Sequence, residues 1–78
     1  YYTYVLYSVT HDRYYIGQTN NLTTRIERHN KGQVQSTKPY RPWKIVYYKE
    51  FNTRAEAMRE EIKLKSLKNV DILNNIVA

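Results

Sequence analysis

The sequence predicts an α+β fold, in which a small three-stranded antiparallel sheet is covered by helices. Three stretches rich in aromatic and β-branched residues predict the strands, and two polar stretches that begin with capping residues predict the helices. The predicted order is strand, strand, helix, strand, helix. At 78 residues, the chain forms one domain over 1–78 and is too short for a doubly wound sheet or two independent cores.

The first predicted strand covers residues 2–9. Successive side chains of a strand point to opposite faces, and both faces of this strand are largely apolar, so we expect both to be covered. A polar turn at 10–13 and a second strand at 14–18 complete an antiparallel hairpin. The third strand is predicted over 43–51, after a loop at 33–42 that holds both prolines.

The first helix is predicted from Leu22 to Lys31, with Asn20 or Asn21 among its candidate N-caps and Gly32 just beyond its end. The second helix begins after Thr53, which forms a capping box with Glu56, and runs to residue 67 or 68. A short third helix is predicted over 70–77.

Composition limits the classes of function. Lys and Arg number 13 against 7 Asp and Glu, and this net charge of +6 favours a polyanionic partner, either nucleic acid or an anionic membrane surface. The absence of Cys excludes disulfides, a thiolate nucleophile and a Cys-based zinc site. No apolar run approaches the roughly 18 residues that span a bilayer, and no export signal is visible. We therefore expect a cytoplasmic protein that acts away from membranes.

Two residues of the first helix, Arg25 and His29, lie one turn apart beside the apolar Leu22 and Ile26. A cation and a titratable ring at the edge of a core-facing stripe are candidates for catalysis. The structural alternative is an Arg that extends past the core and a His that bonds to a neighbouring carbonyl.

The second helix places Glu61 on its inward arc, between Met58 on one flank and Ala57 and Leu64 on the other. A carboxylate in that position is costly unless it is paired or binds a metal ion. Two interpretations stay open. Glu61 either forms a salt bridge with Arg25 or holds a hard divalent ion whose shell is completed by water and phosphate.

The aromatic and basic residues suggest contacts with nucleic acid. Of Tyr14 and Tyr15, only one can share a sheet face with Tyr4, and Gly17 marks a close approach of backbone or ligand. Tyr40 and Trp43 could stack on bases, although Trp43 fits a core position better. Four residues around the loop would form a rim that neutralises phosphates: Lys31, Lys38, Arg41 and Lys44.

Together these residues resemble the GIY-YIG nuclease superfamily, over nearly the whole chain. The resemblance is carried by Tyr2-Thr3-Tyr4, by Tyr15-Ile16-Gly17-Gln18-Thr19, and by Arg25, His29 and Glu61. Tyr-Thr-Tyr stands where the family has Gly-Ile-Tyr, so only Tyr4 of the first motif carries over. The chain is most similar to the small stand-alone bacterial branch, which is related to the nuclease domain at the start of the UvrC excision subunit.

The resemblance implies phosphodiester hydrolysis with a single divalent ion, Mg²⁺ or Mn²⁺. By position, Glu61 would be the metal ligand and Arg25 would stabilise charge on the scissile phosphate. Tyr4 and Tyr15 would line the site and His29 would assist proton transfer, with the general base left open among these three. Asn74 or Asn75 lies near a position that is Asn in some members.

Function is therefore predicted as a metal-dependent endonuclease acting on DNA rather than RNA, structure-selective and linked to repair. The alternative is a catalytically weak or inactive nucleic-acid-binding module of the same fold. A purely structural partner-binding domain would leave the inward Glu61 and the net charge of +6 unexplained. Specificity would come from a homodimer or a protein partner, or the domain would be promiscuous.

Overall fold

The computed structural model describes residues 1–67 and contains a three-stranded sheet in the order β2-β1-β3. The strands are β1 (Tyr2–Ser8), β2 (Arg13–Thr19) and β3 (Lys44–Glu50). The central strand β1 pairs antiparallel with both neighbours. The predicted α+β class is confirmed. The helix predicted at 70–77, together with Asn74 and Asn75, lies outside the described residues.

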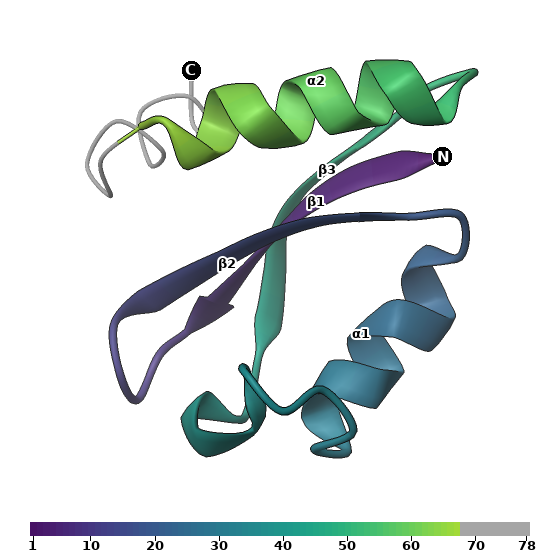
Figure 1. Cartoon of the computed structure of the whole chain (residues 1–78). Helices are drawn as coiled ribbons and strands as arrows, with labels where there is room; N and C mark the ends of the chain where they lie inside the picture. Colours follow the sequence, from purple (N-terminus) through teal and green to yellow (C-terminus); the bar gives the residue numbers. More distant parts are fainter. Residues whose placement is uncertain (68–78) are drawn as a thin grey trace.

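The two helices cover opposite faces of the sheet (Figure 1). Helix α1 (Leu22–Asn30) packs on the face that carries the buried Tyr4 and Leu6, and α2 (Arg54–Lys65) packs on the face that carries Val5. Alternation along β1 therefore sends its apolar side chains into two thin core layers. This arrangement confirms the expectation that both faces of the first strand are covered.

The helix ends follow the predicted capping residues. The Asn21 side chain accepts a hydrogen bond from Thr24 N–H at 3.1 Å, and Gly32 adopts the left-handed φ of 76° after α1. The Thr53 hydroxyl accepts from Glu56 N–H at 3.2 Å. Both helices end earlier than predicted. Helix α1 ends at Asn30 and not at Lys31, and α2 ends at Lys65 and not at residue 67 or 68.

Strand boundaries also differ from the prediction. The first strand stops at Ser8, while β2 gains one residue at each end. Trp43 is a core residue as expected, but it precedes β3. Its backbone N–H donates to Asn30 Oδ1 at 2.6 Å, and its carbonyl accepts from Asn30 Nδ2 at 3.1 Å. A side chain therefore provides the bonds that a strand partner would otherwise make.

The connection between α1 and β3 is held against the sheet despite its irregular sequence. It contains a short 3₁₀-helix, η1 (Lys38–Tyr40), where a plain loop was expected. The Ser8 hydroxyl donates to the Tyr40 carbonyl at 2.7 Å, and Trp43 Nε1–H donates to the Thr37 carbonyl at 2.9 Å. These bonds fix the segment that faces the end of α1.

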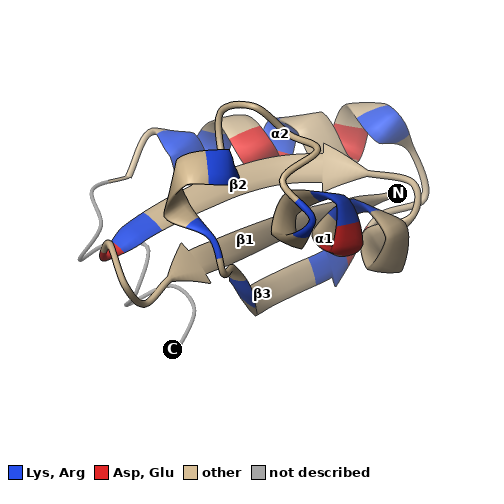
Figure 2. Ribbon diagram, turned by 90° about the horizontal axis from the view of Figure 1, so that it is seen from below, with Lys and Arg blue, Asp and Glu red and all other residues tan. Residues whose placement is uncertain are grey.

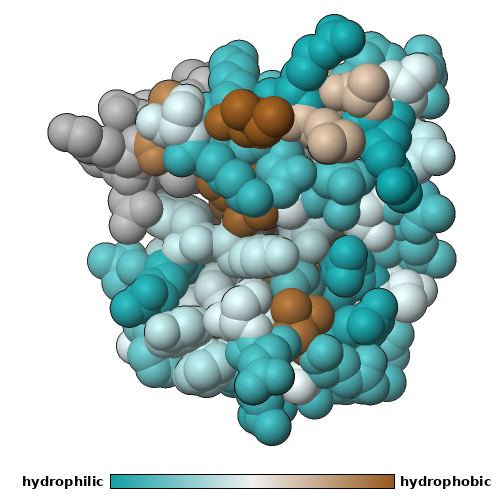
Figure 3. All heavy atoms as spheres, in the orientation of Figure 1, coloured by the Kyte–Doolittle hydropathy of each residue, from teal (hydrophilic) through white to brown (hydrophobic). Residues whose placement is uncertain are grey.

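The outer side of α2 is partly apolar. Met58 and Ile62 stay exposed, and Figure 3 shows hydrophobic atoms over this helix within a mostly hydrophilic surface. Within residues 1–67, no helix is both long enough and apolar enough to cross a membrane.

Candidate active site

The candidate site begins at the middle of β1, where Tyr4 lies opposite Gly17 of β2. A Cβ atom at Gly17 would lie 2.6 Å from Tyr4 Oη and 2.8 Å from Cζ, so the phenol ring occupies the space above this glycine. The close approach at Gly17 is therefore made by the side chain of Tyr4, and not by backbone or a ligand as predicted. The ring can cross the neighbouring strand only because that strand presents no side chain there.

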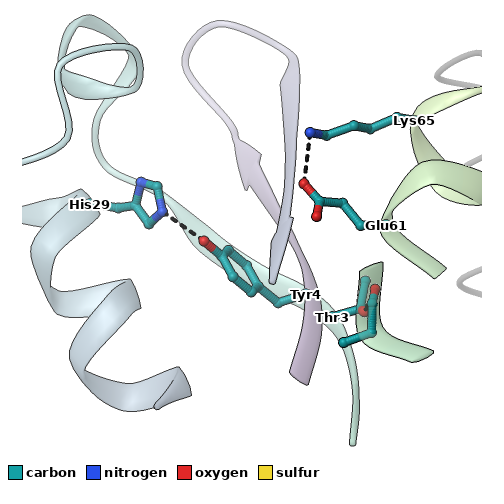
Figure 4. Close-up of polar contacts among 6 residues, drawn as sticks. Thr3, Tyr4, His29, Glu61 and Lys65 are labelled. Carbon is teal, nitrogen blue, oxygen red and sulfur yellow. Dashed lines mark hydrogen bonds and ion pairs between the residues drawn. The ribbon is translucent and has the colours of Figure 1, made fainter. Parts of the chain in front are cut away.

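Helix α1 brings His29 to the tip of this ring. His29 Nε2 lies 3.0 Å from Tyr4 Oη (Figure 4), and the imidazole is fully buried. Tyr15 shares this face, with its ring centroid 4.8 Å from that of His29. The sequence had left open which of Tyr14 and Tyr15 would join Tyr4, and the structure selects Tyr15.

The other ring nitrogen of His29 faces the loop, where its Nδ1 lies 2.8 Å from Thr37 Oγ1. The structural alternative for His29, a bond to a carbonyl, is therefore wrong, because both partners are hydroxyl groups. Thr37 is a residue that sequence reasoning missed. It stands in an irregular segment between Ser36 and Lys38, and no spacing in that segment indicates a buried hydroxyl.

The electrostatics of the pair follow from burial and from the arginines of α1. Burial, together with the smaller effect of the positive charges of Arg25 and Arg28, lowers the pKa of His29 to about 4. Burial also raises the pKa of Tyr4 well above its usual range. Tyr15 adds to that rise, Arg25 opposes it and Glu61 adds to it. Near neutral pH the site therefore holds a neutral imidazole and a protonated phenol.

Arg25 is half-buried on α1, and its charge acts on both members of the Tyr4–His29 pair. Among residues 1–67, no carboxylate lies within ion-pair distance of it. It lines a hollow of about 180 Å³ together with Arg28 and polar groups at the start of α1. Charge-assisted hydrogen bonds to an oxyanion are the strong interactions that such a guanidinium can make.

Glu61 lies on α2, and Figure 4 shows it with Lys65 on the other side of the strands from Tyr4 and His29. Its carboxylate is 2.7 Å from Lys65 Nζ, and its side chain is 19% exposed. Of the two interpretations left open for Glu61, the salt bridge to Arg25 is therefore wrong. Met58 was expected beside Glu61 on the inward arc of the helix, but it does not lie on the buried face, since 44% of its surface is exposed.

Glu61 offers a metal ion a single carboxylate ligand. Among residues 1–67, no three His, Cys, Asp or Glu side chains converge as a metal site. That arrangement does not suit an ion caged by protein ligands. It does fit Mg²⁺, which keeps several waters and takes one or two carboxylates together with substrate phosphates.

Comparison with known proteins identifies the family. The GIY-YIG catalytic domain family matches residues 1–74. The chain belongs to the GIY-YIG family. Membership implies nuclease activity in general, which is the hydrolysis of phosphodiester bonds.

Relatives of this GIY-YIG chain are small bacterial proteins. It is 36% identical to UPF0213 protein OB0043 of Oceanobacillus iheyensis, over 80% of this chain and 73% of that protein. It is 44% identical to a UPF0213 protein of Pediococcus pentosaceus, over 65% of this chain and only 55% of that protein. The solution NMR structure of UPF0213 protein BH0048 from Bacillus halodurans matches with a TM-score of 0.61 and 27% identity. That match covers 97% of this chain and 81% of that one.

The four residues predicted to form a basic rim on this GIY-YIG domain are all exposed. Figure 2 shows Lys and Arg on α1, on the loop that follows it and at the start of β3. Two of the four have intramolecular partners: Lys31 pairs with Glu27 at 3.2 Å, and Arg41 Nε–H donates to the Lys38 carbonyl at 3.0 Å.

The predicted base-stacking residues are only partly available. Trp43 is 5% exposed, so it cannot present a face to a base. Tyr40 is half-buried, and the Arg13 guanidinium lies over its ring at 4.4 Å from the centroid.

Proposed function

We propose that this GIY-YIG chain is a divalent-metal-dependent endonuclease that hydrolyses phosphodiester bonds in DNA. The observation that carries the proposal is the Tyr4–His29 pair, a phenol 3.0 Å from a buried neutral imidazole, with a half-buried arginine beside it that lacks a carboxylate partner in residues 1–67. A proton acceptor and an anion-binding group beside one phenol are what phosphoryl transfer to water requires.

Arg25 would bind the scissile phosphate and stabilise the negative charge that develops on its oxygens. Part of its cost of desolvation is already met in the free protein, because it is half-buried on the α1 surface. The arriving phosphate would also offset the positive charge that now lowers the pKa of His29. Substrate binding would therefore make His29 a better proton acceptor than it is in the free protein.

Tyr4 would connect the attacking water with His29. In this step the water gives a proton to Tyr4 Oη while the Tyr4 hydroxyl gives its proton to His29 Nε2. The water oxygen forms the new bond to phosphorus, the bond from phosphorus to the leaving oxygen breaks, and that oxygen takes a proton from solvent. Tyr4 and His29 are both fully buried in the free protein, so the step requires that substrate binding admits one water to Tyr4 Oη. His29 would act only through Tyr4, with Tyr15 closing the other side of the imidazole.

Glu61 would hold the divalent ion, Mg²⁺ or Mn²⁺, once its carboxylate leaves Lys65. When bound, the ion supplies Lewis-acid stabilisation of the phosphate charge and helps to orient water. The protein contributes one carboxylate, so substrate phosphate and water would complete the coordination. Metal binding and nucleic-acid binding would then be coupled.

DNA would lie along the basic side of the molecule, where Lys31, Lys38, Arg41 and Lys44 would neutralise phosphates without reading base sequence. We extend the proposal to structured or damaged DNA in the bacterial cytoplasm. There a second copy of the chain or a protein partner would supply selectivity.

The ion pair between Glu61 and Lys65 favours a second candidate function. If Lys65 keeps the carboxylate from metal, the domain would bind nucleic acid and cleave it poorly or not at all. The +6 charge would serve either function.

Nicking of supercoiled plasmid distinguishes the two. The wild-type chain would be compared in Mg²⁺, Mn²⁺ and EDTA with Glu61→Gln and with a matched control, Glu60→Gln. The control removes a charge from the same helix but keeps an acceptor for the Tyr47 hydroxyl, now 3.0 Å from Glu60 Oε2. We expect metal-dependent nicking that Glu61→Gln abolishes and Glu60→Gln retains, with salt-sensitive DNA binding unchanged in both. DNA binding without nicking by the wild type would support the binding module instead.

A further inference from the structure

The loop residue Thr37 carries a hydroxyl that none of the roles above uses. Thr37 is 2% exposed and immediately precedes η1. Its Oγ1 lies 2.8 Å from His29 Nδ1 and 3.2 Å from the Val34 carbonyl oxygen. Its backbone carbonyl accepts separately from Trp43 Nε1–H at 2.9 Å, so the residue is held from two sides.

The direction of this hydrogen-bond chain follows from counting hydrogens. In the forward direction the Thr37 hydroxyl donates to the Val34 carbonyl, which also accepts from the backbone N–H groups of Thr37 and Lys38, and Oγ1 accepts from His29 Nδ1–H. His29 Nε2 then has a free lone pair, and the Tyr4 hydroxyl donates to it across 3.0 Å. In this direction the hydrogens of the Thr37 hydroxyl, His29 Nδ1 and the Tyr4 hydroxyl each have an acceptor.

The opposite direction of the hydrogen-bond chain leaves one buried hydrogen without an acceptor. If the Thr37 hydroxyl donated to Nδ1, His29 Nε2–H would donate to Tyr4 Oη. The Tyr4 hydroxyl hydrogen would then have no partner, since His29 is the only hydrogen-bond partner of Tyr4 Oη among residues 1–67. The contact from Thr37 to Val34 would be lost as well. A buried donor without an acceptor is the costly state, so the forward direction is favoured.

We propose that Thr37 is a positioning residue that fixes the tautomer of His29, so that Nε2 is unprotonated and able to accept the Tyr4 hydroxyl proton. The hydrogen bond made by one ring nitrogen of a histidine sets the protonation of the other. The catalytic consequence rests on the function proposed above, whereas the tautomer itself does not.

The test is nitrogen-15 NMR of the histidine rings in wild type, Thr37→Val and Thr37→Ser. The chain has two histidines, and the spectrum of His29→Gln assigns the signals of His29. In the wild type near pH 7.5 we expect the proton on Nδ1 of His29 and none on Nε2. Thr37→Val has nearly the same shape but cannot accept. In this variant each tautomer leaves one buried donor unpaired, either Nδ1–H or the Tyr4 hydroxyl, so the wild-type preference for Nδ1–H should be lost and both tautomers should be populated. Thr37→Ser should keep the wild-type pattern.

Cleavage supplies a separate readout. Loss of the hydrogen bond that orients a metal-bound histidine costs on the order of 10- to 100-fold. We expect Thr37→Val to slow plasmid nicking by a similar factor, because Thr37 orients His29 in the same way, and Thr37→Ser to retain the wild-type rate. Trp43 fluorescence checks folding of both variants, because the Thr37 backbone carbonyl that binds the indole remains.

Each result decides a different claim. A wild-type His29 protonated on Nε2 would overturn the proposal, whether or not Thr37→Val folds. So would a Thr37→Val variant with an unchanged tautomer. If the tautomer behaves as expected but the wild type does not nick DNA under any metal condition, Thr37 still positions His29 and the proposed nuclease function is what fails.

Discussion

Acidification should destabilise this domain through His29. Burial and, to a lesser extent, the charges of Arg25 and Arg28 lower the pKa of His29 from 6.5 to about 4 in the folded state. At pH 8 the imidazole is neutral in both states and contributes nothing to the pH dependence. As the pH falls below 6.5, the unfolded chain takes up the proton first, so the free energy of unfolding decreases. The decrease is about 2 kcal/mol at pH 5 and reaches about 3 kcal/mol below pH 4.

The assay is urea unfolding followed by fluorescence of the single, buried Trp43 at pH 8 and pH 5. Carboxylates also titrate in this range, so the informative quantity is the difference between wild type and His29→Gln, which cannot take up the proton. His11→Gln, a change at the exposed histidine, serves as the control and should behave as the wild type does. Equal losses of stability in wild type and His29→Gln would show that His29 is not held neutral by burial.

Three further predictions follow from single contacts. Gly17→Ala would place a methyl group 2.6 Å from Tyr4 Oη, so urea unfolding should show a loss of about 1–3 kcal/mol. A loss below about 0.5 kcal/mol would contradict the close packing of the ring on this strand. Asn30→Ala removes two hydrogen bonds that hold the residue before β3, and calorimetry should register about 1–3 kcal/mol of lost stability. Lys65→Gln frees the Glu61 carboxylate, so half-maximal nicking should need about two- to five-fold less Mg²⁺, and an unchanged requirement would argue against Glu61 as the ligand.

Sequence patterns predicted the fold well because the signals were local. Alternation in the first strand required cover on both faces, and the caps at Asn21 and Thr53 placed both helix starts. The ends of helices and strands were predicted less accurately where tertiary contacts determine them. The strand predicted from Trp43 begins one residue later, because the Asn30 side chain occupies the backbone groups of Trp43.

The site was predictable to the extent that it depends on helical and strand periodicity. Those periods put Arg25 and His29 on one arc and one of the two adjacent tyrosines beside Tyr4. In the structure Tyr15 lies beside Tyr4, His29 contacts Tyr4, and the charge of Arg25 acts on His29. Periodicity does not report which side chains meet across the loop, so the Thr37 contact was missed. It also does not tell which face of the sheet a helix covers, so the pairing of Glu61 with Arg25 was wrong, and Lys65 on the same helix is the partner.

The central claim is that Tyr4 links the attacking water to His29. The measurement that tests it most directly is the single-turnover rate of DNA cleavage by Tyr4→Phe, in which only the hydroxyl is removed. Tyr48→Phe is the matched control, because Tyr48 pairs with Tyr4 in the sheet and is exposed. We predict a rate reduced by about 10²- to 10⁴-fold in Tyr4→Phe, with DNA binding unchanged and Tyr48→Phe close to wild type. A Tyr4→Phe variant that cleaves DNA at the wild-type rate would contradict the account.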